Sequence, residues 1–267
     1  MGSINTYVVR KKIKQYIRSL SDNIPSNKYY KHNGVRIEKR NFIKDYFGWG
    51  SGEDPSREGG IVKSHESLTR RGDSVVVVGG GTGITGIRAA KIVGDRGEVT
   101  IFEGGRESVQ RIEEVLRMNN VNDRCNVFHT IVGRSDNVYG GSQEKARYMS
   151  PSEIPNCDVL ELDCEGAEIL IIKNITFNPR VLIVELHPWN FDEEYEEVLG
   201  ILSEKGYEVE GCYGHEGNRV ANQSAKEMHI SSRESYEVYV NDVTVGDVRR
   251  MENGARWPMV ISLSLCS

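Results

Sequence analysis

The chain has 267 residues, of which 38% are hydrophobic and 27% charged, with 28 glycines and a net charge of −5. These values are typical of globular proteins and exclude disordered, collagen-like and disulfide-rich small proteins. No apolar run reaches the roughly 18 residues of a membrane span, and the amino terminus lacks the small-residue cleavage site of a secretory signal, so we expect a cytoplasmic protein.

Basic residues gather at the amino terminus. Residues 1–45 contain eleven Lys or Arg against three Asp or Glu, so the rest of the chain is acidic. Apolar residues recur at spacings of three and four across residues 13–20, which predicts an amphipathic basic helix. We expect this helix, at residues 10–20, to contact an anionic membrane surface, a partner or the acidic body of the protein. Gly, Ser and Pro are frequent in residues 48–60, which indicates a long loop.

A change of pattern divides the chain into a basic helical leader or lid, residues 1–72, and a main domain, residues 73–267. In the main domain, short apolar runs alternate with helical stretches, a pattern typical of parallel strands joined by crossover helices. The predicted strands are 74–79, 98–103, 126–132, 157–163 and 180–187, and the predicted helices are 84–93, 106–119, 166–173 and 192–205. Because the strands are apolar throughout, we expect an α/β fold with a doubly wound, mostly parallel sheet. Residues 207–213 and 235–240 alternate in polarity and predict an antiparallel pair that closes the sheet.

A glycine-rich loop follows the first of these strands. The segment VVVVGGGTGITG places Gly79, Gly80, Gly81 and Gly83 between a buried strand and a helix. Glycine allows the backbone to approach a ligand closely, and the free amides of a helix N-terminus favour polar or anionic groups. The next strand ends in Glu103, twenty residues after Gly83, and its carboxylate can accept hydrogen bonds from two ribose hydroxyls. Together these features predict a site for a cofactor that contains adenosine.

Two cofactor classes fit this loop. Gly79-x-Gly81-x-Gly83 matches the pattern of S-adenosylmethionine-dependent methyltransferases, whereas Gly81-x-Gly83-x-x-Gly86 matches the dinucleotide pattern. An NAD(P)-dependent oxidoreductase is therefore one alternative, although no Tyr-x-x-x-Lys pair follows the loop. A catalytically degenerate cofactor-binding module is the other alternative.

Acidic side chains follow two later strands. LELDCEGAE ends the fourth strand and contains Asp163, Glu165 and Glu168, and VELHPW ends the fifth and contains Glu185 and His187. In open α/β sheets the ligand crevice lies outside the carboxyl ends of the strands. Because unpaired carboxylates are costly to bury, we expect this group to bind or activate a ligand.

These segments resemble the FkbM-type family of S-adenosylmethionine-dependent O-methyltransferases, particularly its archaeal versions. The resemblance spans about residues 61–210 and is carried by VVVVGGGTGITG, IFEGGRESVQRIEEVLRMNNV, LELDCEGAEILIIKNI and PRVLIVELHPW. The D-x-E-G-x-E segment followed by a P-x-x-x-x-E strand is its most specific part. The resemblance implies a seven-stranded, Rossmann-like class I methyltransferase fold and methyl transfer to an oxygen of a sugar, glycan or related small molecule.

The resemblance also implies residue roles. The loop glycines would line S-adenosylmethionine, Glu103 would bind its ribose, and Asp163 would face its methionine end or the methyl acceptor. The chain departs from the family at Val77, two residues before the first glycine. Methyltransferases of this fold usually have Asp or Glu there, which helps to fix the cofactor.

For the reaction we predict His187 as the general base, because its unperturbed pKa lies nearest neutrality, with Asp163 as the second candidate. Glu185, Glu165 and Glu168 would orient the base or bind hydroxyls of the acceptor, and Glu168 has the alternative of stabilising a helix N-terminus. We assign no metal, although the carboxylates of Asp163 and Glu185 would suit magnesium. We expect no nucleic-acid partner, because the main domain is acidic and lacks interleaved basic and aromatic residues.

Overall fold

The computed structural model describes the central sheet and its helices. The described residues are 29–38, 57–133, 143, 145–164, 166–186, 201–214, 228–230, 238–240, 243–244 and 259–265. The predicted basic helix at residues 10–20 lies outside them, as does most of the predicted helix 192–205, of which residues 201–204 are described and helical.

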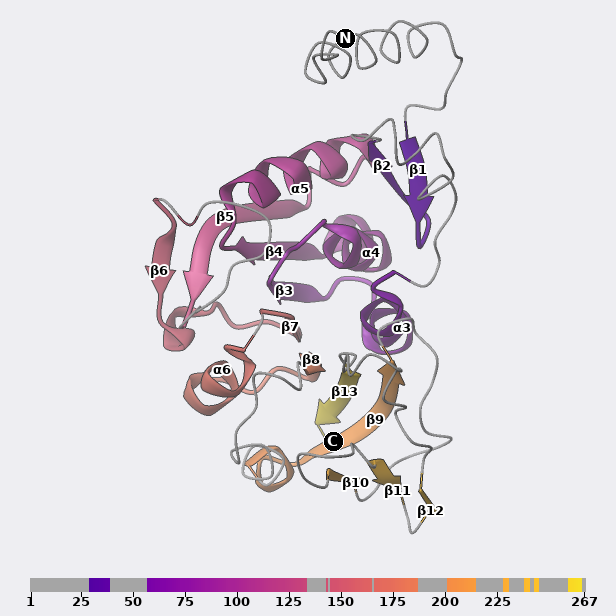
Figure 1. Ribbon diagram of the computed structural model, residues 1–267, viewed down its shortest axis with the longest axis vertical. Helices are drawn as coiled ribbons and strands as arrows, with labels where there is room; N and C mark the ends of the chain where they lie inside the picture. Colours follow the sequence, from indigo (N-terminus) through magenta and orange to yellow (C-terminus); the bar gives the residue numbers. More distant parts are fainter. Residues whose placement is uncertain are drawn as a thin grey trace, which may run out of the picture.

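A single large sheet forms the centre of the molecule (Figure 1). Its strands are β3 (Ser74–Val78), β4 (Glu98–Glu103), β5 (Cys125–Val132), β6 (Arg147–Met149), β7 (Val159–Leu162), β8 (Val181–Leu186), β9 (Tyr207–Gly214) and β13 (Met259–Leu265). In the described part of the chain they form eight strands in the order β6-β5-β4-β3-β7-β8-β13-β9. The strands from β6 to β8 are parallel, and β13 runs antiparallel to both β8 and β9. The order reverses direction at β3, so the crevice beside β3 is the expected ligand position of such a sheet.

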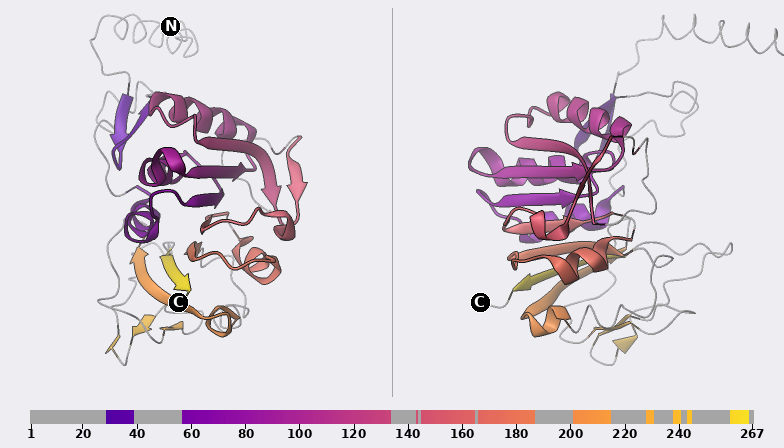
Figure 2. Two further views of the ribbon diagram at one scale, coloured as in Figure 1. Left: turned by 180° about the vertical axis from the view of Figure 1, so that it is seen from behind. Right: turned by 90° about the vertical axis from the view of Figure 1, so that its left-hand side faces the viewer.

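Four complete α-helices cover this sheet in the described part of the chain. They are α3 (Gly59–Leu68), α4 (Ile84–Val93), α5 (Arg106–Met118) and α6 (Glu168–Asn174). Figures 1 and 2 show α3, α4 and α5 on one side and α6 on the other. Successive residues of a strand face opposite sides, so Val75 and Val77 pack with α3, α4 and α5 whereas Val76 and Val78 pack with α6. The predicted doubly wound, mostly parallel sheet is confirmed, and the short edge strand β6 adds an eighth strand to the expected seven.

The predicted antiparallel pair is wrong in its second member. β9 pairs with β13, which inserts between β8 and β9, and not with residues 235–240. The segment β11 (Val238–Val240) lies instead between β10 (Met228–Ile230) and β12 (Val243–Thr244) in a separate small sheet. Alternating polarity is a local signal for a strand, and the partner of a strand depends on contacts between distant parts of the chain.

The described part of the amino-terminal region packs on the main domain. β1 (Tyr29–His32) and β2 (Val35–Glu38) form an antiparallel hairpin, which the sequence analysis did not predict. Val35, Ile37 and, from α3, Ile61 are buried in the same cluster as α4 and α5. The division of the chain into a leader and a main domain stays a prediction.

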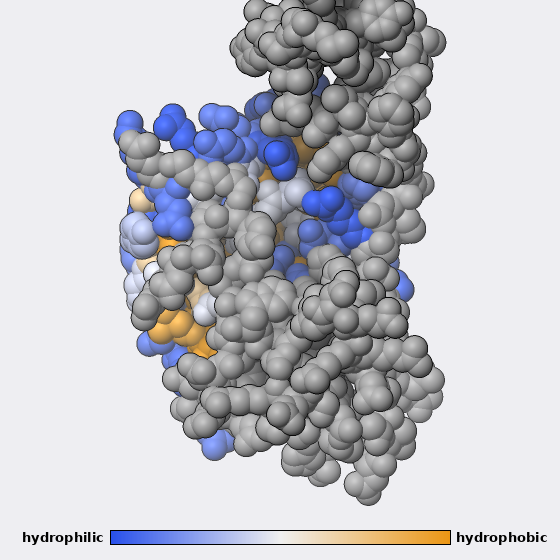
Figure 3. Space-filling view, in the orientation of Figure 1, coloured by the Kyte–Doolittle hydropathy of each residue, from blue (hydrophilic) through white to orange (hydrophobic). Residues whose placement is uncertain are grey.

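The outer face of α5 is polar. Arg106, Glu107, Glu113 and Arg117 are exposed, whereas Ile112 lies in the core. Figure 3 shows hydrophilic side chains gathered over this region. Among the described residues, no helix has both the length and the apolar character needed to cross a membrane.

Candidate functional site

The glycine loop between β3 and α4 lies against the end of β7. Gly79 has a φ of +95°, and a Cβ built on it would lie 1.7 Å from the carbonyl oxygen of Asp163. The Gly79 amide donates to the carbonyl of Phe102 at 2.9 Å, and the Asp163 amide donates to the carbonyl of Val78 at 2.9 Å. The loop is therefore joined to the ends of both neighbouring strands, and only glycine fits at position 79.

Glu103 is buried at the end of β4 and faces the loop. Its Oε2 accepts a hydrogen bond from the Gly81 amide at 2.8 Å, and its Oε1 accepts one from the Gly105 amide at 2.6 Å. Burial raises the pKa of the Glu103 carboxyl above its ordinary range, and the amides of Gly105 and Gly81 oppose that shift. The Gly80 amide is a third donor, so of the roughly four lone-pair sites of the carboxylate at least one remains for a hydroxyl of a ligand.

Further polar groups of the loop are available to a ligand. Thr82 Oγ1 is buried and has no hydrogen-bond partner among the described residues. A Cβ built on Gly81 would meet nothing within 4 Å, so the loop is open there. Gly83 precedes α4 and provides no side-chain cap, which leaves amides of the first helical turn free for a polar ligand.

Three carboxylates converge at the carboxyl ends of β7 and β8. Glu58 comes from the residue before α3, Asp163 follows β7, and Glu185 lies near the end of β8. One carboxylate oxygen from each lies within 4.8 Å of the other two. Burial raises the pKa of the Asp163 carboxyl well above its ordinary range, and the charges of Glu185 and Glu58 raise it further. The structure thus brings together two predicted site residues and adds Glu58, which the sequence analysis placed in a loop without a role.

This spacing would also let the three carboxylates share one divalent cation, since magnesium and calcium prefer oxygen ligands. Carboxylates gather at many protein surfaces without an ion, so the cluster by itself does not define a metal site. The assignment of no metal stays a prediction.

The other predicted acceptor and base residues are placed differently. Glu168 is the first residue of α6 and is buried, and its two oxygens accept hydrogen bonds from the amides of Cys164 at 2.9 Å and Gly166 at 2.8 Å. These bonds stabilise the turn before α6, and contact of Glu168 with an acceptor stays a prediction. His187 and Glu165 lie outside the described residues, so their predicted roles are untested.

A second buried polar cluster adjoins the first turn of α4. His65 Nε2 lies 2.6 Å from Glu161 Oε2, and Thr85 Oγ1 donates to Glu161 Oε1 at 2.6 Å. On the other side of the ring, His65 Nδ1 lies 2.8 Å from Thr69 Oγ1. Both Glu161 and His65 are 0% exposed. These residues were not among the predicted site residues, although an acidic residue inside an otherwise apolar strand was a visible signal at Glu161.

His129 is another neighbour of the cofactor region that the sequence analysis missed. It pairs with Glu103 across β4 and β5, and its Nε2 lies 3.0 Å from the carbonyl oxygen of Gly104. No local pattern marks His129, because its position beside Glu103 depends on the register of two strands.

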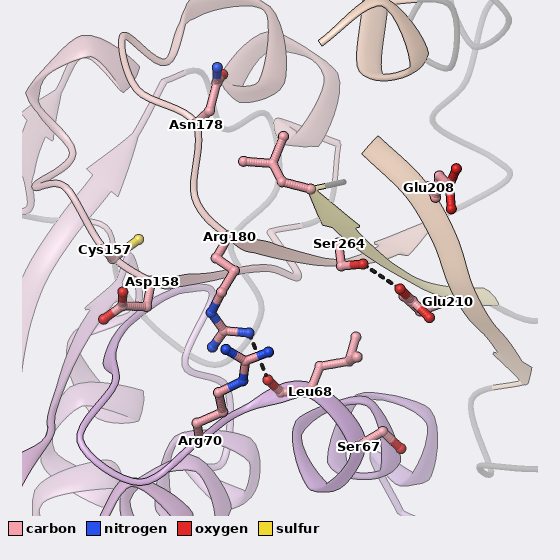
Figure 4. A pocket seen from close by; sticks show the side chains of 11 residues that line it. Ser67, Leu68, Arg70, Cys157, Asp158, Asn178, Arg180, Glu208, Glu210 and Ser264 are labelled. Atoms are coloured by element: carbon pink, nitrogen blue, oxygen red, sulfur yellow. Dashed lines mark hydrogen bonds between the residues drawn. The ribbon is translucent and has the colours of Figure 1, made fainter. Parts of the chain in front are cut away.

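A cavity of about 710 Å³ opens at the opposite edge of the sheet, at the amino ends of β7 and β8 (Figure 4). Figure 4 shows Arg70 beside Arg180 at its wall. Arg180 pairs with Asp73 at 2.5 Å and donates to the carbonyl of Leu68 at 3.1 Å. None of the predicted site residues lines this cavity, so it is separate from the crevice at the glycine loop.

Comparison with known proteins agrees with the predicted class. Residues 145–209, which include Asp163 and Glu168, match the family described as the Methyltransferase FkbM domain. No curated protein matches the sequence. The family match confirms the predicted resemblance over this part of the chain, which is about a quarter of its length.

At low sequence identity the chain is also similar to many solved structures. One is TYW2 of P. horikoshii in complex with MeSAdo, with 16% identity over 87% of this chain and 68% of that chain and a TM-score of 0.45. A SAM-dependent O-methyltransferase from Thermotoga maritima has 16% identity over 78% of this chain and 65% of that chain, with a TM-score of 0.43. The precorrin-6y C5,15-methyltransferase from Geobacter metallireducens has 12% identity over 77% of this chain and 87% of that chain, with a TM-score of 0.44. At these values no residue role or substrate is transferred from them.

Proposed function

We propose that the protein is an O-methyltransferase that transfers a methyl group from S-adenosylmethionine to a hydroxyl or carboxyl oxygen of a sugar, glycan or related small molecule. The observation that carries this proposal is the position of the acidic cluster beside the glycine loop. Asp163 contributes its carboxylate to the cluster, and its backbone carbonyl contacts Gly79 of the loop. A cofactor on the loop and an acceptor at the cluster would therefore be neighbours.

The residues around the loop fit the cofactor. Glu103 retains lone-pair capacity for a ribose hydroxyl, and the buried Thr82 hydroxyl and the first amides of α4 offer hydrogen bonds to polar groups. The negative charges of Asp163, Glu185 and Glu58 favour the binding of a cationic group such as a sulfonium or an ammonium.

Bound S-adenosylmethionine supplies a methyl group on a sulfonium, so that the carbon–sulfur bond breaks as the carbon–oxygen bond forms and S-adenosylhomocysteine is released. A hydroxyl acceptor must also lose its proton. General-base catalysis contributes about 10²- to 10⁴-fold and works best when the pKa of the base lies near the working pH. The raised pKa of Asp163 suits it to accept this proton, and His187 remains the other candidate base.

Acceptor positioning is the remaining requirement. Holding two reactants in attack geometry supplies about 7 to 11 kcal/mol of the barrier. We assign this role to the carboxylates of Glu185 and Glu58, which can accept hydrogen bonds from neighbouring hydroxyls of a polyhydroxylated acceptor.

Cofactor binding is the first test. Calorimetric titration of the full chain with S-adenosylmethionine, S-adenosylhomocysteine and NAD is expected to show binding of the first two only. The variant Glu103→Gln should weaken that binding, whereas Glu98→Gln, at the exposed start of the same strand, should leave it unchanged. Binding of NAD alone would indicate an oxidoreductase and overturn the proposal.

Acceptor class is the second test. Transfer of radiolabelled methyl from S-adenosylmethionine is measured against a panel of sugars, glycans and small carboxylic acids. Methylated oxygen in a product, identified by mass spectrometry, supports the proposal. Cofactor binding without transfer to any member of the panel would favour a degenerate cofactor-binding module.

A further inference from the structure

We infer that Glu161 is a positioning residue that holds the glycine loop ready for the cofactor, in place of the acid that this chain lacks at position 77. The inference rests on the proposed function, because its readout is cofactor binding. It assigns to β7 a task that the resemblance places on β3.

The contacts of Glu161 lead to the start of α4. Its Oε1 accepts a hydrogen bond of 2.6 Å from the hydroxyl of Thr85, the second residue of α4. Its Oε2 lies 2.6 Å from His65 Nε2 on α3. One carboxylate therefore ties together a strand and two helices, at the turn that immediately follows Gly83.

The position of Glu161 corresponds to that of the missing acid. Val77 and Glu161 are register partners across the parallel pair β3 and β7. Register partners in a parallel pair direct their side chains to the same face of the sheet, and Val77 faces α3, α4 and α5. The carboxylate of Glu161 therefore lies one strand away from position 77, on the same face of the sheet. It remains close to the N-terminus of α4, where negative charge is favourable.

Core packing alone does not explain an acid at this position. The two register partners of Glu161 are Val77 on β3 and Ile183 on β8, and both are 0% exposed. An apolar residue at position 161 would pack between these two apolar side chains. Replacing buried charged groups by well-packed apolar ones is often neutral or stabilising, so the carboxylate and its two partners indicate a role in orienting the loop.

The test compares three variants of the full chain. Glu161→Gln keeps the shape of the side chain but removes its charge, and Thr85→Val removes only the hydroxyl that reaches it. Ile183→Val is the matched control, because Ile183 is the buried neighbour of Glu161 on the same face and its apolar side chain cannot form hydrogen bonds with the polar cluster. For each variant, stability is measured by denaturant unfolding, and the dissociation constants of S-adenosylmethionine and S-adenosylhomocysteine are measured by calorimetry.

We expect Glu161→Gln and Thr85→Val to weaken both ligands by about tenfold, the ratio expected for loss of one charge-assisted hydrogen bond. Ile183→Val should stay within about twofold of the unaltered chain even where its unfolding midpoint falls, because local contacts rather than overall stability would set the affinity. Unchanged affinity in both cluster variants, or an equal loss in Ile183→Val, would overturn the inference. If the unaltered chain bound neither ligand, the proposed function itself would fail, and the inference with it.

Discussion

Gly79 and Asp163 are in backbone contact: a Cβ on Gly79 would lie 1.7 Å from the carbonyl oxygen of Asp163. This contact joins the glycine loop to the end of β7, which is followed by the candidate base Asp163. The distance between the loop and the acidic cluster is therefore set by the backbone, and side-chain changes at the cluster should leave the loop in place.

Replacement of Gly79 by Ala should destabilise the protein strongly. The new methyl group would overlap backbone atoms that cannot rotate away, and the positive φ adds strain, so we expect a loss of roughly 3 kcal/mol or more in the free energy of unfolding. The matched control is Gly81→Ala, which also has a positive φ but open space around its Cβ, and which should cost about 1 kcal/mol. Denaturant unfolding of both variants measures the difference, and equal losses would contradict the close contact.

Replacement of Asp163 by Asn should stabilise the protein near neutral pH while removing activity. Because the pKa of Asp163 is higher in the folded than in the unfolded chain, the folded state binds the proton more tightly. The stability that this group contributes is present below its unfolded pKa and is lost as the pH rises through the raised folded pKa. We expect a gain on the order of 1 kcal/mol at pH 8 that disappears near pH 4.

Unfolding curves of Asp163→Asn and the unaltered chain at these two pH values check the stability. Methyl transfer by the variant should fall by about 10²-fold or more if Asp163 accepts the proton. Full activity at saturating acceptor would leave His187 as the base.

Cofactor binding should weaken as the pH is lowered. The loss should begin at a higher pH than it would for a glutamate with the ordinary pKa of 4.5. The raised pKa of Glu103 means that its carboxylate is protonated earlier as the pH falls, and a protonated oxygen accepts a ribose hydroxyl less well. The measurement is the dissociation constant of S-adenosylhomocysteine between pH 4.5 and pH 8. In Glu103→Gln the affinity should be lower and should lose this pH dependence, and an unchanged profile in that variant would assign the titration to another group.

Val77→Asp should be destabilising alone and less so in a chain that also carries Glu161→Gln. Val77 is 0% exposed and is the register partner of Glu161, so the single variant would bury two like charges side by side. We expect a coupling of about 1 kcal/mol or more in a double-mutant cycle of unfolding free energies. Additive effects would show that the two positions do not share one electrostatic environment.

Several elements were readable from local patterns. The apolar run EVTIFE predicted β4 at Glu98–Glu103, and the predicted helix 84–93 has the same bounds as α4. Glu103 faces the glycine loop, because the end of a parallel strand and the loop after its neighbour meet at one edge of the sheet, and its predicted contact with a ribose stays a prediction. These features depend on residues close together in the chain or on the regular geometry of parallel strands.

The sequence by itself determined that the protein has a parallel sheet buried on both faces, a glycine loop after its first strand and acids at the carboxyl ends of later strands. The tertiary structure decided which distant residues join them. Glu58 reaches the cluster of Asp163 and Glu185, Glu161 lies beside Val77, and β13 inserts between β8 and β9. Hydrophobic periodicity records how each residue faces its own strand or helix, whereas these contacts arise from strand register and helix packing, which are set by the free energy of the whole fold.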